Sequence, residues 1–230
     1  MSSIVYGKNS FFEALNNNRI LKAYVIDDSK IKNSNIDYEI VDRNTLDKMS
    51  KHANHQGYLA KVKEFELSSI EDMIKKENGF IVLLDGLEDV HNLGAIIRTC
   101  DCAGVDGIIY KKHNSVKIND TVAKVACGSL EYAKVAEVTN LVSTIKSLKD
   151  KGYWIVGSDG YAEQLYTDIK YDFNVVLVIG SEGKGISRLV KEECDYMVKL
   201  PMLGHVTSLN ASVAAGILIY NVINSRKTNK

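Results

Sequence analysis

Apolar and polar residues alternate along most of this chain, and the pattern separates two regions. From residue 80 onward, short apolar runs are separated by amphipathic stretches long enough for helices. These runs predict strands at 81–84, 107–110, 133–135, 154–156, 175–179 and 196–200. Strands that alternate with helices are typical of an α/β fold whose sheet is mostly parallel and carries helices on both faces. The run at 175–179 contains no polar residue, which predicts a central strand buried on both sides.

The first 63 residues show a shorter set of elements that is typical of a small α/β domain. The pattern predicts helices at 10–15 and 45–50 and strands at 23–26, 38–41 and 57–62. The polar stretch that follows contains Ser68-Ser69-Ile70-Glu71, a capping-box pattern that predicts the start of a short helix. We therefore expect a small domain at 1–63, a linker at 64–79 and a larger domain at 80–230.

Composition limits the classes of partner. The chain has 230 residues, of which 45% are hydrophobic, and its 29 Lys and Arg balance 29 Asp and Glu. A chain without net charge has no general attraction to nucleic acid, so a surface that binds one must be a local patch.

Cysteine spacing and the amino-terminal residues predict a location. The four cysteines, at 100, 102, 127 and 194, form no Cys-x-x-Cys pair and show no metal-ligand spacing with the histidines. We therefore expect no metal, and reduced thiols in a cytoplasmic protein. The amino terminus lacks an apolar signal-peptide stretch, and no apolar run approaches the ~20 residues that span a bilayer, so no membrane partner is expected.

The first block with candidate chemistry is Asn-Leu-Gly-Ala-Ile-Ile-Arg at 92–98. It follows a predicted strand and an acidic loop, and it continues into a helix that ends at Gly104. Arg98 is then expected about one turn into a helix that begins at the carboxyl end of a strand, where open α/β sheets bind ligands. The alternative is an ion pair between Arg98 and a surface carboxylate such as Asp101.

The second block, Gly-Ser-Glu-Gly-Lys-Gly at 180–185, follows the buried strand. It does not satisfy Gly-x-x-x-x-Gly-Lys-[Ser/Thr], and it does not satisfy Gly-x-Gly-x-x-Gly because position 188 is Arg. A nucleotide-phosphate loop is therefore not expected. Three glycines in six residues predict a backbone that turns sharply and approaches another group closely. The alternative is an ordinary turn between a strand and a helix.

The third block, Leu-Pro-Met-Leu-Gly-His-Val-Thr-Ser-Leu-Asn-Ala-Ser at 200–212, contains the chain's single proline, Pro201, which ends the preceding strand. Ser208 suits the N-cap of a helix at about 209–225. One face of that helix carries Val213, Ile217 and Tyr220 at helical spacing, and Ile223 and Asn224 are candidates to extend it. We expect this face in the core, by about two to one over a subunit interface.

These three blocks, in this order, resemble the signature motifs of the SpoU/TrmH family of RNA 2′-O-ribose methyltransferases. The resemblance covers about residues 80–225. It extends to Val-Tyr-Gly-Lys-Asn-Ser at 5–10 and His-Gln-Gly-Tyr-Leu-Ala at 55–60, which look like the family's small substrate-binding domain. The resemblance implies a SPOUT-type α/β domain with a trefoil knot, an RNA-binding domain similar to ribosomal protein L30e, and a homodimer that uses S-adenosylmethionine.

The resemblance also implies site residues. The positions that match the family's catalytic ones are Asn92, Arg98, Glu182, Ser208 and Asn210. Cofactor-binding positions are Gly180, Gly183, Leu200, Met202, Ser208 and Leu209.

The roles of these residues remain open at the level of sequence. Arg98 fits stabilisation of a negatively charged 2′-oxygen or of a phosphate better than general-base chemistry, because arginine is a strongly basic side chain that carries a positive charge. Asn210 and Glu182 can orient the cofactor, the ribose or Arg98. For Ser208 the alternative to a catalytic role is that of a helix cap alone.

The small amino-terminal domain makes the chain most similar to the branch of the family that methylates a guanosine in 23S rRNA. The sequence leaves two alternatives: methylation of another ribose in rRNA or tRNA, and a non-catalytic RNA-binding or ribosome-assembly protein on the same scaffold.

Overall fold

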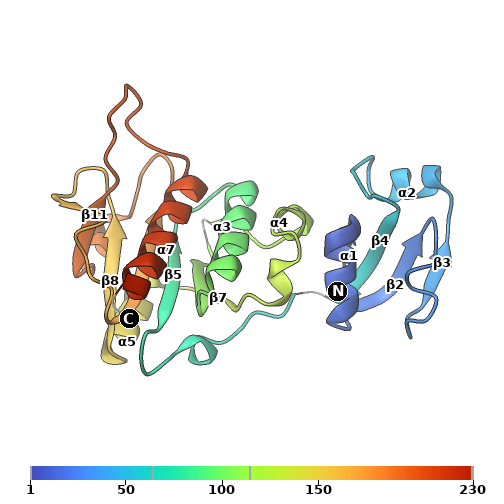
Figure 1. Cartoon of the computed structure of the whole chain (residues 1–230), viewed down its shortest axis with the longest axis horizontal. Helices are drawn as coiled ribbons and strands as arrows, with labels where there is room; N and C mark the ends of the chain where they lie inside the picture. The colour runs from blue at the N-terminus through green and yellow to red at the C-terminus, as the bar shows by residue number, and fades with distance from the viewer. Residues whose placement is uncertain (1, 64, 114, 229–230) are drawn as a thin grey trace. The chain divides into compact units, whose positions relative to one another are not determined.

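The computed structural model describes residues 2–63, 65–113 and 115–228, and the chain divides into two compact units. The first unit comprises Met1–Glu66 and Ile118–Tyr132, and the second comprises Leu67–Lys117 and Ala133–Lys230. Figure 1 labels most of the larger helices and strands of both units. These compact units do not coincide with the domains expected at 1–63 and 80–230. The expected limits describe functional domains, and they stay a prediction.

The first unit is built on a four-stranded sheet in the order β1-β4-β2-β3. Its elements are β1 (Ser2–Tyr6), α1 (Lys8–Asn16), β2 (Ile20–Val25), β3 (Tyr38–Ile40), α2 (Arg43–Met49) and β4 (Tyr58–Lys63), followed by α4 (Asp120–Val125) and the 3₁₀ helix η2 (Ser129–Glu131). Phe11 of α1 packs with Val25, Ile31 and Val62 in the core. The two helices and three strands expected in this region are confirmed, and β1 is an additional strand.

The segment 118–132 belongs to the first unit through side-chain contacts that no local pattern predicts. The Lys124 ammonium lies 4.7 Å from the centre of the Tyr6 ring. Arg19 forms an ion pair with Glu131, and both side chains are mostly buried. A Cβ atom at Gly128 would lie 2.4 Å from Cγ of Glu13, so only glycine fits there.

The second unit contains a seven-stranded sheet in the order β7-β6-β5-β10-β8-β11-β9, and all its strand pairs are parallel. Its strands are β5 (Phe80–Asp85), β6 (Gly107–Lys111), β7 (Val135–Val138), β8 (Tyr153–Ser158), β9 (Gln164–Leu165), β10 (Asn174–Gly180) and β11 (Tyr196–Lys199). Its helices are η1 (Glu71–Met73), α3 (Val90–Ala103), α5 (Leu141–Asp150), α6 (Arg188–Glu192) and α7 (Ala211–Thr228). The predicted α/β fold is confirmed.

Helices cover both faces of this sheet. Ile145 and Leu148 of α5 and Val190 of α6 pack with Ile155 and Val178 in one buried cluster. Alternate residues of the strands point to the opposite face, where α7 packs against β10 and α3 against β6. Helices α3 and α7 also pack against each other there (Figure 1). The central strand β10 is buried from Val175 to Ile179, as predicted.

Two local predictions need correction. The capping box lies one residue later than expected, because Ser69 Oγ donates to Asp72 Oδ2 at 2.7 Å and accepts from Asp72 N at 3.3 Å; the helix that follows is the short η1. Strand β7 begins at Val135 instead of 133.

Helix α7 begins later than predicted, and the predicted N-cap is wrong. Asn210, not Ser208, caps the helix, because Asn210 Oδ1 accepts from Ser212 N at 3.0 Å and from Val213 N at 3.3 Å. The prediction that the apolar face of α7 lies in the core is also wrong, because its side chains are exposed: Val213 is 49%, Ile217 38% and Tyr220 45% exposed. These three residues form the α7 stripe. The trefoil knot stays a prediction.

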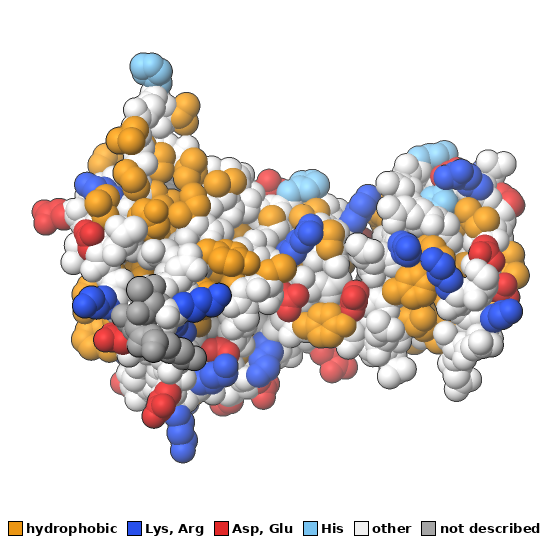
Figure 2. Space-filling model, in the orientation of Figure 1, with side chains coloured by type: hydrophobic (Ala, Val, Ile, Leu, Met, Phe, Trp, Pro, Cys, Tyr) orange, Lys and Arg blue, Asp and Glu red, His pale blue; other side chains and the backbone are white. Residues whose placement is uncertain are grey.

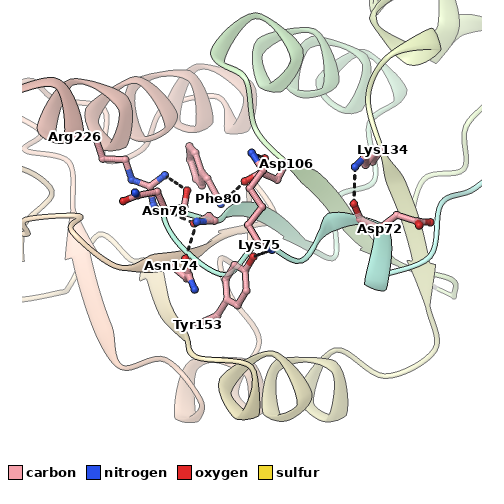
Figure 3. Close-up of polar contacts among 10 residues, drawn as sticks. Asp72, Lys75, Asn78, Phe80, Asp106, Lys134, Tyr153, Asn174 and Arg226 are labelled. Atoms are coloured by element: carbon pink, nitrogen blue, oxygen red, sulfur yellow. Dashed lines mark hydrogen bonds and ion pairs between the residues drawn. The ribbon is translucent and has the colours of Figure 1, made fainter.

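The far end of α7 is held by one arginine (Figure 3). Arg226 donates to the carbonyl oxygens of Asn78 at 2.7 Å and Gly79 at 3.0 Å. It also donates to those of Phe173 at 2.8 Å and Tyr171 at 3.1 Å. Burial lowers the pKa of this guanidinium. The helix is therefore tied to the segments that enter β5 and β10.

Among the described residues, no helix combines the length and apolar character needed to cross a membrane. On the face drawn in Figure 2, Lys and Arg side chains are interspersed with Asp and Glu on both units. That distribution agrees with a chain of zero net charge.

Candidate functional site

The candidate site lies at the carboxyl edge of the second unit's sheet. Because β5 and β10 are adjacent and parallel, with Gly180 opposite Asp85, the loops that follow the two strands meet. They line a cavity of about 490 Å³. Its lining residues are Leu87, Glu88, Asp89, Val90, Ser181, Glu182, Gly183 and Lys184.

Helix α3 starts directly after the first of these loops. Asp89 caps it by accepting the His91 N–H at 2.8 Å, so the helix begins at Val90, earlier than predicted. Asn92 therefore lies in the first turn and is only 4% exposed. The predicted helix end at Gly104 is confirmed, because this residue has φ 68° and closes the helix in the left-handed conformation.

Arg98 lies farther along α3 than expected. It is the ninth residue of the helix instead of about one turn from its start, and it is exposed. At about 100° per residue, its side chain leaves the helix roughly 120° away from that of Asn92. The structure therefore places Asn92 and Arg98 on one helix but on different sides of it.

The glycine-rich block forms a closed turn. Ser181 and Gly185 exchange two backbone hydrogen bonds, of 3.1 and 2.9 Å. A Cβ atom at Gly180 would lie 2.2 Å from the carbonyl carbon of Gly185, and Gly185 has φ 64°. The close approach predicted at Gly180 is thus made by the turn itself. Gly183 is exposed at the tip, next to Glu182.

The Glu182 carboxylate connects all three blocks. Its Oε1 atom accepts hydrogen bonds from Asn92 Nδ2 at 2.7 Å, Asn210 Nδ2 at 2.7 Å and Ala211 N at 3.3 Å. A carboxylate at this place also faces the positive end of the α7 dipole. We call Asn92, Glu182 and Asn210 the carboxylate hub.

Both polar ends of the Asn210 side chain are occupied. Its Nδ2 donates to Glu182, and its Oδ1 accepts from Ser212 and Val213 of α7. Asn210 thus positions the start of α7 and Glu182 relative to each other.

The loop at 200–209 has a different character. None of its residues takes part in a backbone or side-chain hydrogen bond with the described part of the chain. Leu203 is 97% and Val206 74% exposed, whereas Leu200 and Met202 are half-buried. In Figures 1 and 2 the segment between β11 and α7 projects from the second unit and carries hydrophobic side chains. Ser208 and Leu209 lie on it, outside the carboxylate hub.

A further carboxylate supports the edge. Asp85, at the end of β5, is buried and accepts the Ser187 N–H at 2.7 Å, which connects β5 to the start of α6. The acidic loop that follows the predicted strand indicates this residue, although its partner lies 102 positions away. Within 2–63, 65–113 and 115–228, no three His, Cys, Asp or Glu side chains form a group that could hold a metal ion.

Comparison with known families matches both parts of the chain. Residues 79–220 match the family model described as the SpoU rRNA Methylase family, and residues 4–68 match the model described as RNA 2′-O ribose methyltransferase substrate binding. YacO of Bacillus subtilis, which is assigned to the TrmH family of tRNA/rRNA methyltransferases, is 42% identical, and the match covers 96% of this chain and 95% of that protein.

Solved structures show the same fold. The SpoU methyltransferase AviRb of Streptomyces viridochromogenes, crystallised with the cofactor AdoMet, superposes with a TM-score of 0.86 at 21% identity, covering 99% of this chain and 91% of that one. The A. aeolicus TrmH/SpoU tRNA modifying enzyme superposes with a TM-score of 0.60 at 32% identity, covering 67% of this chain and 80% of that one. The family-model match, which spans more than half of the residues, and the identity to YacO lead to one conclusion: this chain belongs to the SpoU rRNA methylase family.

Proposed function

We propose that this RNA methyltransferase transfers a methyl group from S-adenosylmethionine to the ribose 2′-hydroxyl of a guanosine in 23S rRNA, and that it acts as a cytoplasmic homodimer. The observation that carries the proposal is the carboxylate hub, in which Glu182 binds both Asn92 and Asn210 next to a cavity at the carboxyl edge of the sheet. The substrate-binding model matched by residues 4–68 supports an RNA substrate.

The residues at 200–209 fit the proposed cofactor. Adenine needs hydrogen bonds at its edge and apolar contact on its faces. This loop offers backbone N–H and C=O groups that bind no other part of the described chain, beside the apolar side chains of Leu200, Met202 and Leu209. We assign cofactor binding to this loop together with Gly180, Gly183 and Ser208. When bound, S-adenosylmethionine supplies a methyl group that is already activated by a positive sulfur.

Arg98 is assigned to the substrate. A ribose 2′-hydroxyl is a weak nucleophile at neutral pH, so the protein must position it and stabilise the negative charge that grows on its oxygen. The exposed Arg98 offers a fixed, planar positive charge for this oxygen or for a neighbouring phosphate. A role as general base comes second, because arginine stays protonated at neutral pH.

Glu182 and Asn210 are assigned to positioning. One Glu182 oxygen already accepts three N–H groups, and the Asn210 side chain caps α7, so these two residues hold the geometry in which Asn92 is presented. Glu182 itself lines the cavity, and its Oε1 atom holds Asn92 Nδ2 at 2.7 Å, so Asn92 lies directly behind the lining. We therefore assign Asn92 to orientation of the bound ribose.

The α7 stripe supports the proposed homodimer. Val213, Ile217 and Tyr220 present a continuous apolar face on a long helix, and faces of this kind are commonly buried by a second subunit. A self-complementary contact about a two-fold axis needs only one such face on each copy.

The test is methyl transfer from isotope-labelled S-adenosylmethionine to unmodified 23S rRNA and, separately, to bulk tRNA, with mass spectrometry of the nucleosides. Labelled 2′-O-methylguanosine from the rRNA alone is the expected result. Label in tRNA would retain the proposed reaction but identify tRNA as the substrate. The B. subtilis relative is named a tRNA/rRNA methyltransferase, which is why tRNA is the second substrate tested. Absence of label in both, together with no heat on titration with S-adenosylhomocysteine, favours the non-catalytic scaffold.

A further inference from the structure

A basic segment follows β6 at the same edge of the sheet as the carboxylate hub. Residues 111–117 read Lys-Lys-His-Asn-Ser-Val-Lys and contain three lysines, one histidine and no carboxylate. In a chain with equal numbers of positive and negative side chains, this is a local excess of positive charge. We call residues 111–117 the basic loop; Asn114 lies outside the described residues.

The basic loop is held against the cavity. Strands β5 and β6 are parallel neighbours, with Leu84 opposite Tyr110, so the loops that follow them are adjacent. The carbonyl oxygen of Leu87, a cavity-lining residue, accepts from Val116 N at 2.9 Å and from Ser115 Oγ at 3.1 Å. Lys117 directly follows this attachment point.

The other end of the loop is fixed as well. The Lys112 N–H donates to the carbonyl oxygen of Val138 at 2.8 Å. Val116, near the opposite end, is buried. Lys112 and Lys117 are therefore exposed side chains on a backbone that is attached at both ends, so little backbone entropy is lost when they bind a ligand.

The two lysines are available to an external anion. No carboxylate of the described residues forms an ion pair with Lys112 or Lys117, whereas at the opposite edge of the sheet Lys75 pairs with Asp106 and Lys149 with Asp195. The carboxylate nearest in register is Glu137, opposite Tyr110. Burial, with a contribution from Glu137, raises the pKa of Tyr110 to about 12, so this tyrosine stays neutral.

We propose that the basic loop binds the phosphate backbone of the RNA substrate beside the nucleotide presented to the cavity, through Lys112 and Lys117. The proposal rests on the proposed function and adds an RNA contact on the second unit itself. Phosphate contacts position a nucleic acid without reading its sequence, which suits side chains that lie next to the reacting site. A neutral protein needs such a local patch, because its overall field does not attract RNA.

The test compares two double charge reversals. Lys112→Glu with Lys117→Glu removes the patch. Lys76→Glu with Lys151→Glu changes the net charge equally on exposed lysines at the amino edge of the sheet. Binding of unmodified 23S rRNA and of bulk tRNA is measured for both variants and the unaltered protein between 50 and 200 mM salt (about the range over which phosphate contacts dominate). Calorimetry with S-adenosylhomocysteine checks that each variant retains its cofactor site.

We expect the Lys112/Lys117 variant to bind RNA at least roughly 10-fold more weakly than the Lys76/Lys151 variant at the lower salt concentrations. The neutral pair Lys112→Gln with Lys117→Gln should reduce the slope of log affinity against log salt by about 1.4 to 1.8, which corresponds to two phosphate contacts. Equal affinities and slopes in the two charge-reversed proteins, with the unaltered protein binding and methylating RNA, overturn the basic-loop assignment alone. An unaltered protein that binds neither RNA overturns the proposed function as well.

Discussion

Glu182 and Asn210 join the turn after β10 to the capped start of α7 through a hydrogen bond of 2.7 Å between Oε1 and Nδ2. The same Oε1 atom binds Asn92 on α3 at 2.7 Å. The turn after β10, helix α3 and the start of α7, which are far apart along the chain, thus meet at one carboxylate oxygen. The negative charge of this oxygen strengthens the hydrogen bonds that it accepts.

Replacement of Glu182 by Gln should reduce methyl transfer while leaving the fold intact. A neutral amide oxygen accepts N–H donors about half as strongly as a carboxylate, so each of the three N–H contacts of Glu182 Oε1 weakens. We expect kcat/KM for methyl transfer to fall by roughly 10- to 100-fold, which is about 1.4–2.7 kcal/mol. Single-turnover methylation measures this. The matched control is Glu192→Gln on α6, whose carboxylate pairs with Arg188 on the surface, and its rate should be unchanged.

Asn210→Ala should destabilise the second unit through its effect on α7. The substitution removes the acceptor of the Ser212 and Val213 N–H groups and one donor to Glu182. Loss of an N-cap costs about 0.5–2 kcal/mol, measurable by urea denaturation. Asn210→Asp separates the two functions, because aspartate retains the cap and places a second carboxylate against Glu182. Activity of the Asp variant equal to that of the unaltered protein contradicts the positioning role.

Arg226→Ala should destabilise the protein more than any surface substitution on α7. It removes the donors to four backbone carbonyl groups around the entrances of β5 and β10. We expect a loss of about 2–4 kcal/mol in the free energy of unfolding, since the part-buried carbonyl groups of Tyr171, Gly79 and Phe173 each lose a charged donor. Arg226→Lys should lose less, and the exposed neighbour Lys227→Ala should change stability by less than about 0.5 kcal/mol.

Charges on the α7 stripe should produce a folded monomer. Val213 and Ile217 are already 49% and 38% exposed, so Val213→Glu with Ile217→Glu creates no buried charge within one chain. Light scattering coupled to size-exclusion chromatography measures the mass, and circular dichroism confirms the fold. Leu189→Glu on α6 is the control, because Leu189 is 54% exposed and lies outside the stripe. A dimer that survives the double substitution contradicts the proposed interface.

Cys100 and Cys102 should react very differently with alkylating reagents. Cys100 is buried, and burial raises the pKa of its thiol, so less of the reactive thiolate forms at pH 8.5 (about the ordinary pKa of cysteine). Cys102 is exposed on the same helix. Mass spectrometry after iodoacetamide treatment should find Cys102 modified and Cys100 intact in the native protein, and both modified in urea. Modification of native Cys100 at a similar rate contradicts the burial argument.

Much of the fold follows from local patterns. The apolar runs indicate most strands of the parallel sheet because a strand that is buried on both faces contains almost no polar residue, as 175–179 shows. Gly104 marks the end of α3 because the left-handed conformation there suits glycine. The site residues Asn92, Glu182 and Asn210 are indicated by the order and content of the three blocks, and they do lie together.

Other features depend on which distant groups meet. Ser208 and Asn210 are both good N-caps, and Asn210 is used because its amide also reaches Glu182. The outer face of α7 has the periodicity of a core face, yet it stays exposed because the sheet and α3 already cover the opposite side of the helix.

The sequence therefore indicates the elements, the family and the residues with candidate chemistry, because local burial patterns and backbone preferences leave a signature within a few neighbouring positions. Three features have no such signature: the attachment of 118–132 to the first unit, the sharing of one Glu182 oxygen between Asn92 and Asn210, and the contact of the basic loop with Leu87. Each joins residues that are distant in the chain. A hydrogen bond between such residues depends on where the whole fold places them in space.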